Sequence, residues 1–183
     1  MIELLVSFDK SIFLAINYLP HNLLLDYLFG LITFIGYAGL IWIFAGLILY
    51  LARRTLKQKR LITAIFIAEI FYFVTVEFLI KNLYKRLRPQ YKLPEIILPF
   101  DFSHSFSFPS GHAAIAFAGC VIFSKFYPRY SLWFYIAASL IAFSRIYLGK
   151  HYPSDVVVGG LLGFCIGYLS LKLVGDINNA SQY

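Results

Sequence analysis

Charged residues are scarce in this sequence, and their scarcity excludes most soluble proteins. Only 14% of the 183 residues are Asp, Glu, Lys or Arg, whereas 60% are hydrophobic. A soluble domain is about one quarter charged and close to half apolar. A water-soluble core of this size cannot hide so much apolar surface. We therefore expect an integral membrane protein that forms a single domain over residues 1–183.

Cysteine is also rare, which limits the metal and disulfide sites that the chain can build. Its two cysteines, Cys120 and Cys165, both lie in apolar segments, where free thiols are the expected state. No group of His, Cys and carboxylate residues has the spacing of a metal site. We predict that the protein needs no metal and no cofactor.

Targeting signals and repeats are missing as well. The N-terminus opens with the acidic Glu3 instead of a basic region and shows no small-residue cleavage site, so we expect no cleavable signal peptide. There is no internal repeat. The net charge of +7 does not indicate a nucleic-acid partner, because much of the basic charge lies in short loops beside apolar spans, where it sets membrane orientation.

Long apolar stretches are abundant, and they predict an all-α, polytopic transmembrane bundle over residues 24–174. We expect about five spanning helices, each near the roughly 20 residues that a bilayer requires. They cover about residues 24–51, 61–84, 110–127, 130–148 and 154–174. Residues 1–19 contain no such run, because Glu3, Asp9 and Lys10 interrupt the apolar positions. An interfacial amphipathic helix is expected there.

The basic loops predict an orientation in the membrane. Residues 53–60 carry five Lys and Arg side chains, and Lys125 and Arg129 flank the turn between the third and fourth spans. The positive-inside rule places both loops on the inner side. The C-terminal ends of spans two and four and the N-terminal ends of spans three and five then face outward. Four further basic residues favour the reverse orientation, but we assign them to chemistry: Lys81, Lys85, Arg86 and Arg88.

The first polar cluster ends the second span. Lys81 and Arg88 are seven residues apart and would share a helix face, and Pro89 disfavours helix at Arg88. Glu77 lies four residues before Lys81 and can pair with it. Taken alone, two cations at a helix C-terminus fit anchoring by the helix dipole as well as ligand binding.

The second cluster, Pro109-Ser110-Gly111-His112, has the composition of a helix start. Proline suits the first turn, and free N–H groups at residues 110–112 would form an anion site. Gly111 would let a phosphate approach the backbone closely.

The third cluster holds Arg145, His151 and Asp155. Asp155 follows His151 by four residues and can orient the imidazole and stabilise its positive charge, so His151 is a candidate nucleophile. The alternative is an interfacial histidine, with Asp155 only favouring a helix N-terminus. The planar fork of Arg145 suits phosphoryl oxygens.

The three clusters together supply what phosphoryl transfer requires. Cations and amide donors would stabilise charge on the equatorial oxygens, while an in-line nucleophile attacks phosphorus. The cations are Lys81, Arg88 and Arg145, and Ser110 and Gly111 supply the amides. His112 would be the general acid that protonates the leaving oxygen.

These motifs, Lys81-x6-Arg88-Pro89, Pro109-Ser110-Gly111-His112 and Ser144-Arg145-x5-His151-x3-Asp155, resemble the three-part signature of the type 2 phosphatidic acid phosphatase family. The resemblance implies a metal-independent phosphatase with a phosphohistidine intermediate. His151 would be the nucleophile, Asp155 its partner and His112 the general acid. The phosphate would be held by the remaining matched residues, Lys81, Arg88, Ser110, Gly111 and Arg145.

Membrane members of that family have a six-helix core, from which this chain departs by lacking a full first span. Small members of this size resemble bacterial undecaprenyl-diphosphate phosphatases, which implies a bacterial inner-membrane protein with an outward-facing site. Phosphatidylglycerophosphate, phosphatidate or a lipid A 1-phosphate would fit the same residues. A phosphotransferase is a second possibility, and a lipid-phosphate carrier without chemistry is a third.

Overall fold

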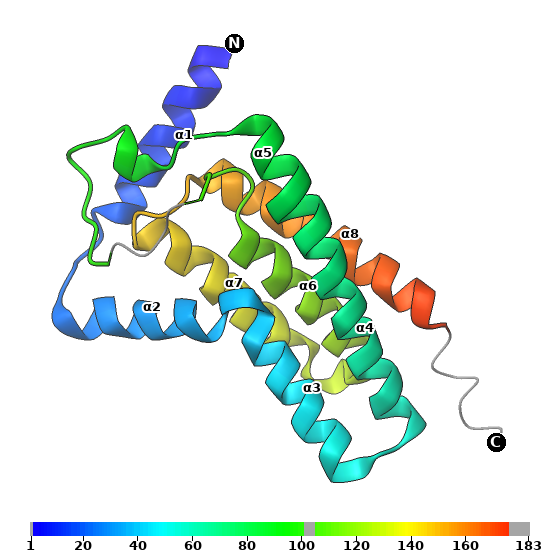
Figure 1. The fold of residues 1–183 in the computed structure, drawn as a ribbon. Coiled ribbons are helices and arrows are strands. Elements are labelled where there is room, and N and C mark those ends of the chain that lie inside the picture. The colour runs from blue at the N-terminus through cyan, green and yellow to red at the C-terminus, as the bar shows by residue number, and fades with distance from the viewer. Residues whose placement is uncertain (1, 101–104, 176–183) are drawn as a thin grey trace.

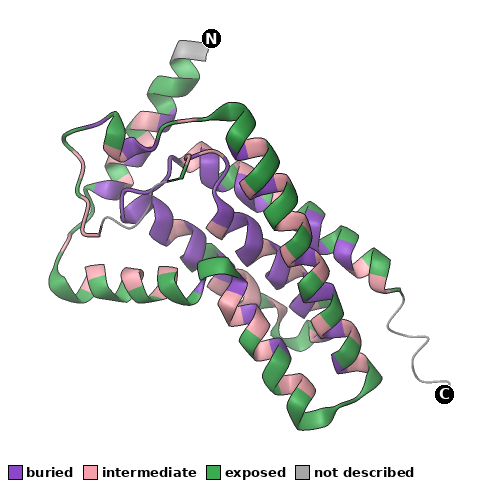
Figure 2. Cartoon of the chain, viewed as in Figure 1, coloured by how far each residue is buried: buried purple, intermediate pink, exposed green. Residues whose placement is uncertain are grey.

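The computed structural model describes residues 2–100 and 105–175, and within these ranges the chain forms helices and no strand. The predicted all-α bundle is confirmed. Figure 1 shows α6 (Gly111–Phe126) in the middle of the bundle, with α4 (Leu56–Tyr72), α7 (Ser131–Tyr147) and α8 (Pro153–Val174) around it. In Figure 2 the buried residues gather on α6 and on the part of α7 nearest the loops, while α2 (Leu23–Ile35) and α3 (Leu40–Arg53) are mostly exposed or intermediate.

Most of the predicted spans match observed helices. The second is built from three consecutive segments: α4, the π-helix η2 (Phe73–Ile80) and α5 (Lys81–Tyr84). The third, fourth and fifth correspond to α6, α7 and α8. By length and composition, two helical stretches of the described chain can cross a membrane, Leu56–Tyr91 and Pro153–Val174. Helix α6 is a shorter apolar helix.

The helix predicted over residues 24–51 is not continuous, because the chain bends there. It forms α2 (Leu23–Ile35), a 3-10 turn η1 (Tyr37–Gly39) and α3 (Leu40–Arg53). The direction of the chain changes by 54° between the two helices. Ala38 and Gly39 both have left-handed backbone conformations, with φ of 45° and 64°. A run of two such residues ends one helix and re-aims the next. Counted as one broken span, the pair brings the candidate crossings to three.

A stripe of glycines brings α8 against α6. Gly159, Gly163 and Gly167 recur every four residues and therefore lie on one helix face. A Cβ at Gly167 would lie 2.7 Å from the carbonyl oxygen of Ala118, and Gly159 and Gly163 face the backbone of Ser110 and Ala114 in the same way. Small residues let two membrane helices approach closely. This packing sets the start of α6 beside the start of α8, where two of the polar clusters lie.

The N-terminal helix α1 (Ile2–Asn17) forms where an amphipathic helix was predicted. One stripe of the helix is buried: Asp9, Phe13 and Asn17, at four-residue spacing. Asn17 donates from Nδ2 to the carbonyl oxygens of Ile97 and Tyr147, both at 2.9 Å. The helix is thereby fixed to α7 and to the loop that follows α5. Its place at the membrane surface stays a prediction.

The two basic turns lie at the same end of the bundle. Lys57, after α3, sits over the ring of Tyr127, which follows α6, at 4.7 Å, and Gln58 donates to the hydroxyl of Tyr127 at 3.2 Å. In Figure 1 the loops that follow α5 and α7 are at the opposite end. This arrangement agrees with the alternation on which the predicted orientation depends.

Candidate active site

Arg88 enters the site from an extended segment and not from a helix face. Helix α5 ends at Tyr84, Lys85 is left-handed with φ of 47°, and Arg88 is extended before Pro89. The prediction that Lys81 and Arg88 share a helix face is therefore wrong, although both reach the same place. Arg88 donates to the Ser105 hydroxyl at 3.0 Å, and Nζ of Lys81 lies 3.5 Å from that oxygen.

Lys81 has the partner that the sequence predicted. Its Nζ lies 2.6 Å and 2.9 Å from the two carboxylate oxygens of Glu77. Glu77 also accepts a hydrogen bond from the hydroxyl of Tyr72 at 2.8 Å. Tyr72 and Glu77 are five residues apart, a spacing that the intervening π-helix brings onto one face. The charge of the buried Lys81 ammonium is therefore balanced by the Glu77 carboxylate, which the Tyr72 hydroxyl holds in place.

The helix start predicted at residues 110–112 is present, but one of its three backbone N–H groups is already hydrogen-bonded. Ser110 is the N-cap of α6, and its backbone N–H donates to the carbonyl oxygen of Asp155 at 2.9 Å. That amide is not free for an anion as predicted, because α8 packs against it. At Gly111 a Cβ would lie 2.7 Å from the hydroxyl oxygen of Tyr72. Gly111 therefore makes room for the Tyr72–Glu77 pair.

His151 is buried in the loop between α7 and α8, with cations around it. Nη1 of Arg88 lies 3.1 Å from its Nε2 and also donates to the carbonyl oxygen of Lys150 at 2.9 Å. Burial, together with the charges of Arg88, Arg145 and Lys81, lowers the pKa of His151 well below its ordinary value of 6.5. The ring is therefore neutral at neutral pH, with a lone pair available for nucleophilic attack.

Asp155 lies beside His151 but is engaged mainly elsewhere. Its Oδ2 is 3.7 Å from Nδ1 of His151, which is longer than a hydrogen bond. The same oxygen accepts from the Ser107 hydroxyl at 2.6 Å and from the backbone N–H of Tyr152 at 3.0 Å. Its Oδ1 pairs with Arg86 at 2.6 Å. The carboxylate is thus fixed by three donors at a distance from which it can stabilise a charged imidazole.

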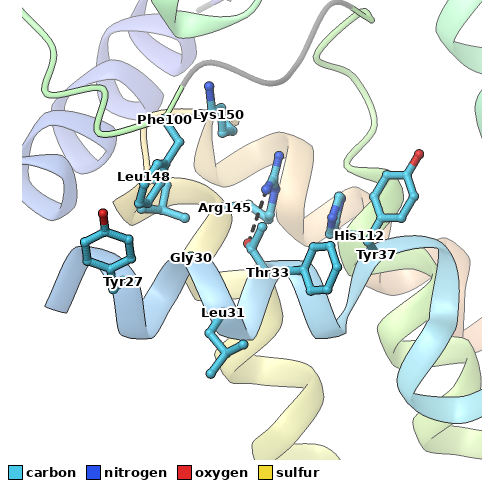
Figure 3. A pocket seen from close by; sticks show the side chains of 11 residues that line it. Tyr27, Gly30, Leu31, Thr33, Tyr37, Phe100, His112, Arg145, Leu148 and Lys150 are labelled. Carbon is cyan, nitrogen blue, oxygen red and sulfur yellow. Dashed lines mark hydrogen bonds between the residues drawn. The ribbon is translucent and has the colours of Figure 1, made fainter. Parts of the chain in front are cut away.

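A cavity of about 600 Å³ opens beside these residues, along α2. His112, Arg145 and Lys150 line it, together with apolar and aromatic side chains such as Phe34 and Phe100. Figure 3 shows Arg145 and His112 directed to the same side of α2, with Thr33 accepting a hydrogen bond from Arg145 at 3.2 Å. Nε2 of His112 is buried and has no hydrogen-bond partner among the described residues. The cavity therefore joins an apolar wall to a cationic end.

The structure brings the candidate residues of all three motifs to one end of the bundle. Arg88 contacts the His151 loop, Ser110 bonds Asp155, and His112, Arg145 and Lys150 share the cavity. Two polar residues at this end were missed from the sequence, Asp9 and Ser107, and Arg86 was assigned to chemistry without a specific role. The four-residue spacing of Asp9, Phe13 and Asn17 could have marked one face of the helix as the inward one, whereas Ser107 lies in a loop without a pattern. Among residues 2–100 and 105–175 no cluster of three His, Cys, Asp or Glu side chains could hold a metal.

The family model and the similar proteins of known name indicate the same family. The family model of the PAP2 superfamily matches residues 58–179. An undecaprenyl-diphosphatase from Sulfolobus acidocaldarius is 30% identical over 97% of this chain and 84% of its own length. A lipid A 1-phosphatase from Rhizobium johnstonii is 32% identical over 74% of this chain, but the match spans only 59% of that relative.

Two solved structures have the same arrangement of helices. The crystal structure of Aquifex aeolicus LpxE superposes with a TM-score of 0.72 at 32% identity, covering 89% of this chain and 94% of that one. A transmembrane PAP2 type phosphatidylglycerolphosphate phosphatase from Bacillus subtilis superposes with a TM-score of 0.71 at 24% identity, covering 92% and 85%. At that identity the second likeness shows the fold alone.

Proposed function

This chain belongs to the PAP2 superfamily, and from that premise we propose that it is a membrane phosphatase that removes a terminal phosphate from a lipid diphosphate by way of a phosphohistidine. The observation that carries the proposal is the contact between Arg88 and Nε2 of His151 at 3.1 Å. A cation from the first motif there meets the candidate nucleophile from the third. A phosphoryl group at that point would be within reach of both.

In the first half of the reaction, the lone pair on Nε2 of His151 attacks phosphorus. The nitrogen–phosphorus bond forms as the bond to the leaving oxygen breaks, and His112 gives that oxygen a proton. Lys81, Arg88 and Arg145 stabilise the charge on the equatorial oxygens, together with the backbone amide of Gly111 at the start of α6, which Ser110 caps. Asp155 stabilises the positive imidazole ring from the Nδ1 side.

In the second half, water replaces the leaving group. It attacks phosphorus in line, the nitrogen–phosphorus bond breaks, and His112 accepts the proton that the water loses. The products are inorganic phosphate and the lipid with one phosphate fewer, and His151 returns to its neutral form. No step in this sequence draws on a metal or a cofactor, so we expect metal-independent activity.

The shape of the cavity supports a lipid substrate. Its apolar wall along α2 suits an acyl or polyprenyl chain, and its cationic end suits a phosphate or diphosphate. Undecaprenyl diphosphate is the substrate we favour, because the relative that matches 97% of this chain is an undecaprenyl-diphosphatase. Lipid A 1-phosphate is the second candidate, on the strength of the Rhizobium relative.

We also propose that the site faces the outer side of a bacterial inner membrane. The basic turns after α3 and α6 share one end of the bundle, which the positive-inside rule assigns to the cytoplasm. The loops that carry His151 and Arg88 lie at the other end (Figure 1). Labelling of a single cysteine placed in either set of loops by a membrane-impermeant reagent would test this assignment.

The direct test of function is phosphate release in detergent from pure undecaprenyl diphosphate, lipid A 1-phosphate, phosphatidylglycerophosphate and phosphatidate. We expect release from the diphosphate to be fastest, and absent in His151→Ala. A protein that leaves all four lipids intact would overturn the proposal. Transfer of labelled phosphate to an added acceptor in place of release would identify a phosphotransferase, and lipid movement without hydrolysis would identify a carrier.

A further inference from the structure

The N-terminal helix brings a buried carboxylate to the proposed active site. Asp9 lies on the inward stripe of α1 and is only 9% exposed. Its Oδ1 accepts from the backbone N–H of Ser154 at 2.9 Å, and its Oδ2 accepts from the Ser154 hydroxyl at 2.6 Å. Both bonds join residue 9 to the first turn of α8, one residue before Asp155. The contact joins residues that lie 145 positions apart in the sequence.

Arg86 connects this carboxylate to Asp155. Nη2 of Arg86 donates to Oδ2 of Asp9 at 2.7 Å, and Nη1 donates to Oδ1 of Asp155 at 2.6 Å. The guanidinium also lies over the Tyr152 ring at 4.2 Å. A planar guanidinium with fixed donor directions holds two carboxylates in a defined geometry, which a flexible ammonium does not do as well. The result is a chain of contacts, Asp9–Arg86–Asp155, which the Ser154 hydroxyl also joins by accepting from Nη1 of Arg86 at 2.8 Å.

The far end of this chain is the proposed nucleophile. Oδ1 of Asp155 is taken by Arg86, and Oδ2 is the oxygen that faces His151 at 3.7 Å. The side chain of Asp155 is completely buried, so its direction is set by its partners and not by solvent. Arg86 on Oδ1 therefore acts with the Ser107 and Tyr152 donors on Oδ2 to fix which carboxylate oxygen turns toward the imidazole ring.

We propose that Arg86 and Asp9 are positioning residues for Asp155, which makes the N-terminal helix a working part of the active site. Arg86 keeps the Asp155 carboxylate turned toward His151, and Asp9 keeps Arg86 in place. Neither residue lines the cavity along α2. This inference rests on the proposed phosphatase function, since it concerns the stabilisation of the imidazole that carries the phosphoryl group.

The expected signature is a fall in kcat with little change in KM. Misplacing a group that acts only as charge develops affects the transition state and leaves ground-state binding intact. We expect Arg86→Gln to lower kcat by about 100-fold and Asp9→Asn by about tenfold. Arg86→Lys should recover part of the loss, because an ammonium can still pair with Asp155.

The test is steady-state kinetics of Asp9→Asn, Arg86→Gln, the double variant and Arg86→Lys, on the lipid that the wild type hydrolyses best. Lys10→Gln is the matched control: it lies next to Asp9 on α1 and breaks an exposed ion pair with Glu95, at 3.4 Å, which has no link to Asp155. We expect the control to match wild type. If Asp9 acts through Arg86, the double variant should have the kcat of Arg86→Gln alone.

Several results would overturn the inference. These are multiplicative losses in the double variant, a rise in KM without a fall in kcat, an equal loss in Lys10→Gln, or no difference between Arg86→Lys and Arg86→Gln. If Asp9→Asn does not fold, the comparison of the two Arg86 variants decides alone. A wild type without activity would refute the proposed function, whereas an active wild type with unaffected variants would refute only this inference.

Discussion

Arg88 and His151 meet nitrogen to nitrogen, with Nη1 of the guanidinium 3.1 Å from Nε2 of the imidazole. A guanidinium can only donate, so Nε2 is the acceptor and the ring proton of neutral His151 is on Nδ1. The nitrogen that faces the cations is therefore the one with the lone pair. The same arrangement places Nδ1–H on the side of Ser107 and Asp155.

The first prediction concerns the two histidines. His151→Ala removes the proposed nucleophile and should abolish phosphate release. His112→Ala should lower kcat by roughly 10²–10⁴-fold, the usual contribution of a general acid–base group. Malachite-green detection of phosphate measures both. Wild type quenched during turnover of a ³²P-labelled lipid should retain acid-labile label on the protein, and label retained equally by His151→Ala would contradict the assignment.

The second prediction concerns the pH dependence of kcat/KM, whose decline toward acidic pH should occur at a lower pH than the ordinary pKa of histidine would give. The nucleophile is the neutral imidazole, whose fraction falls as the pH drops through its pKa. Because burial and neighbouring cations lower the pKa of His151 below 6.5, the acidic limb of the kcat/KM profile should lie below pH 6.5. Measurements of kcat/KM from pH 4.5 to 8 test this. A limb centred at or above pH 6.5 would contradict the assigned environment of the ring.

The third prediction concerns metals and phosphate mimics. Treatment with EDTA followed by desalting should leave the rate unchanged, because cationic side chains serve in place of a metal. Orthovanadate resembles pentacoordinate phosphorus and should inhibit competitively. Loss of activity with EDTA that returns on adding magnesium would contradict the mechanism, and a phosphatase assayed with a known magnesium requirement is the control for the treatment.

Much of the architecture and the site was predictable because it depends on local sequence. Apolar stretches located the later helices to within a few residues: the fifth predicted span, 154–174, corresponds to α8, which runs from Pro153 to Val174. The three motifs lie at helix ends, and alternation of spans is enough to bring such ends together. The bend at Gly36–Gly39 was not predicted, since glycines in a membrane span usually indicate close packing and not a break.

The residues that escaped prediction act only through contacts distant in sequence. For Arg86 the sequence indicates chemistry but no specific role, because that role depends on Asp9 and Asp155, which lie 77 and 69 positions away. Ser107 is in an irregular loop whose path no periodicity sets. Lys81 and Arg88 do not share a helix face because Lys85 ends the helix in a left-handed conformation, which a lysine at this position does not predict.

The fourth prediction uses the glycine stripe between α6 and α8. In Gly163→Ala the added methyl meets the backbone carbonyl of Ala114, which cannot move aside, so we expect a loss of about 1–3 kcal/mol in the free energy of unfolding. Gly160→Ala is the matched control on the same helix. There the methyl would lie 3.1 Å from the ring of Phe117, which can shift.

Thermal unfolding in detergent compares the two glycine variants. A loss of this size should lower the Tm of Gly163→Ala by roughly 2–10 °C, with Gly160→Ala close to wild type. Equal Tm values for the two variants would show that the close approach of α6 and α8 does not set stability. A folded Gly163→Ala with reduced kcat would show in addition that this packing positions Ser110 and Asp155.

The last prediction tests the cavity along α2 as the place of the lipid chain. Gly30 lines the cavity, and a Cβ there would lie 2.9 Å from the ring of Phe100. Gly30→Leu should therefore fill space that a long chain needs. We expect its KM for a long-chain lipid phosphate to rise about tenfold, the equivalent of about 1.4 kcal/mol of binding free energy. For a short-chain analogue that keeps the phosphate, the KM should be unchanged.

Leu28→Trp supplies the control, because Leu28 is on the same helix, 46% exposed and outside the cavity lining. It should hydrolyse both lipids at the wild-type rate. If Gly30→Leu raised KM equally for long and short chains, the cavity would contact the headgroup and not the tail. If neither KM changed, the chain would have to leave the site by another route, and the apolar wall of α2 would serve only to face the bilayer.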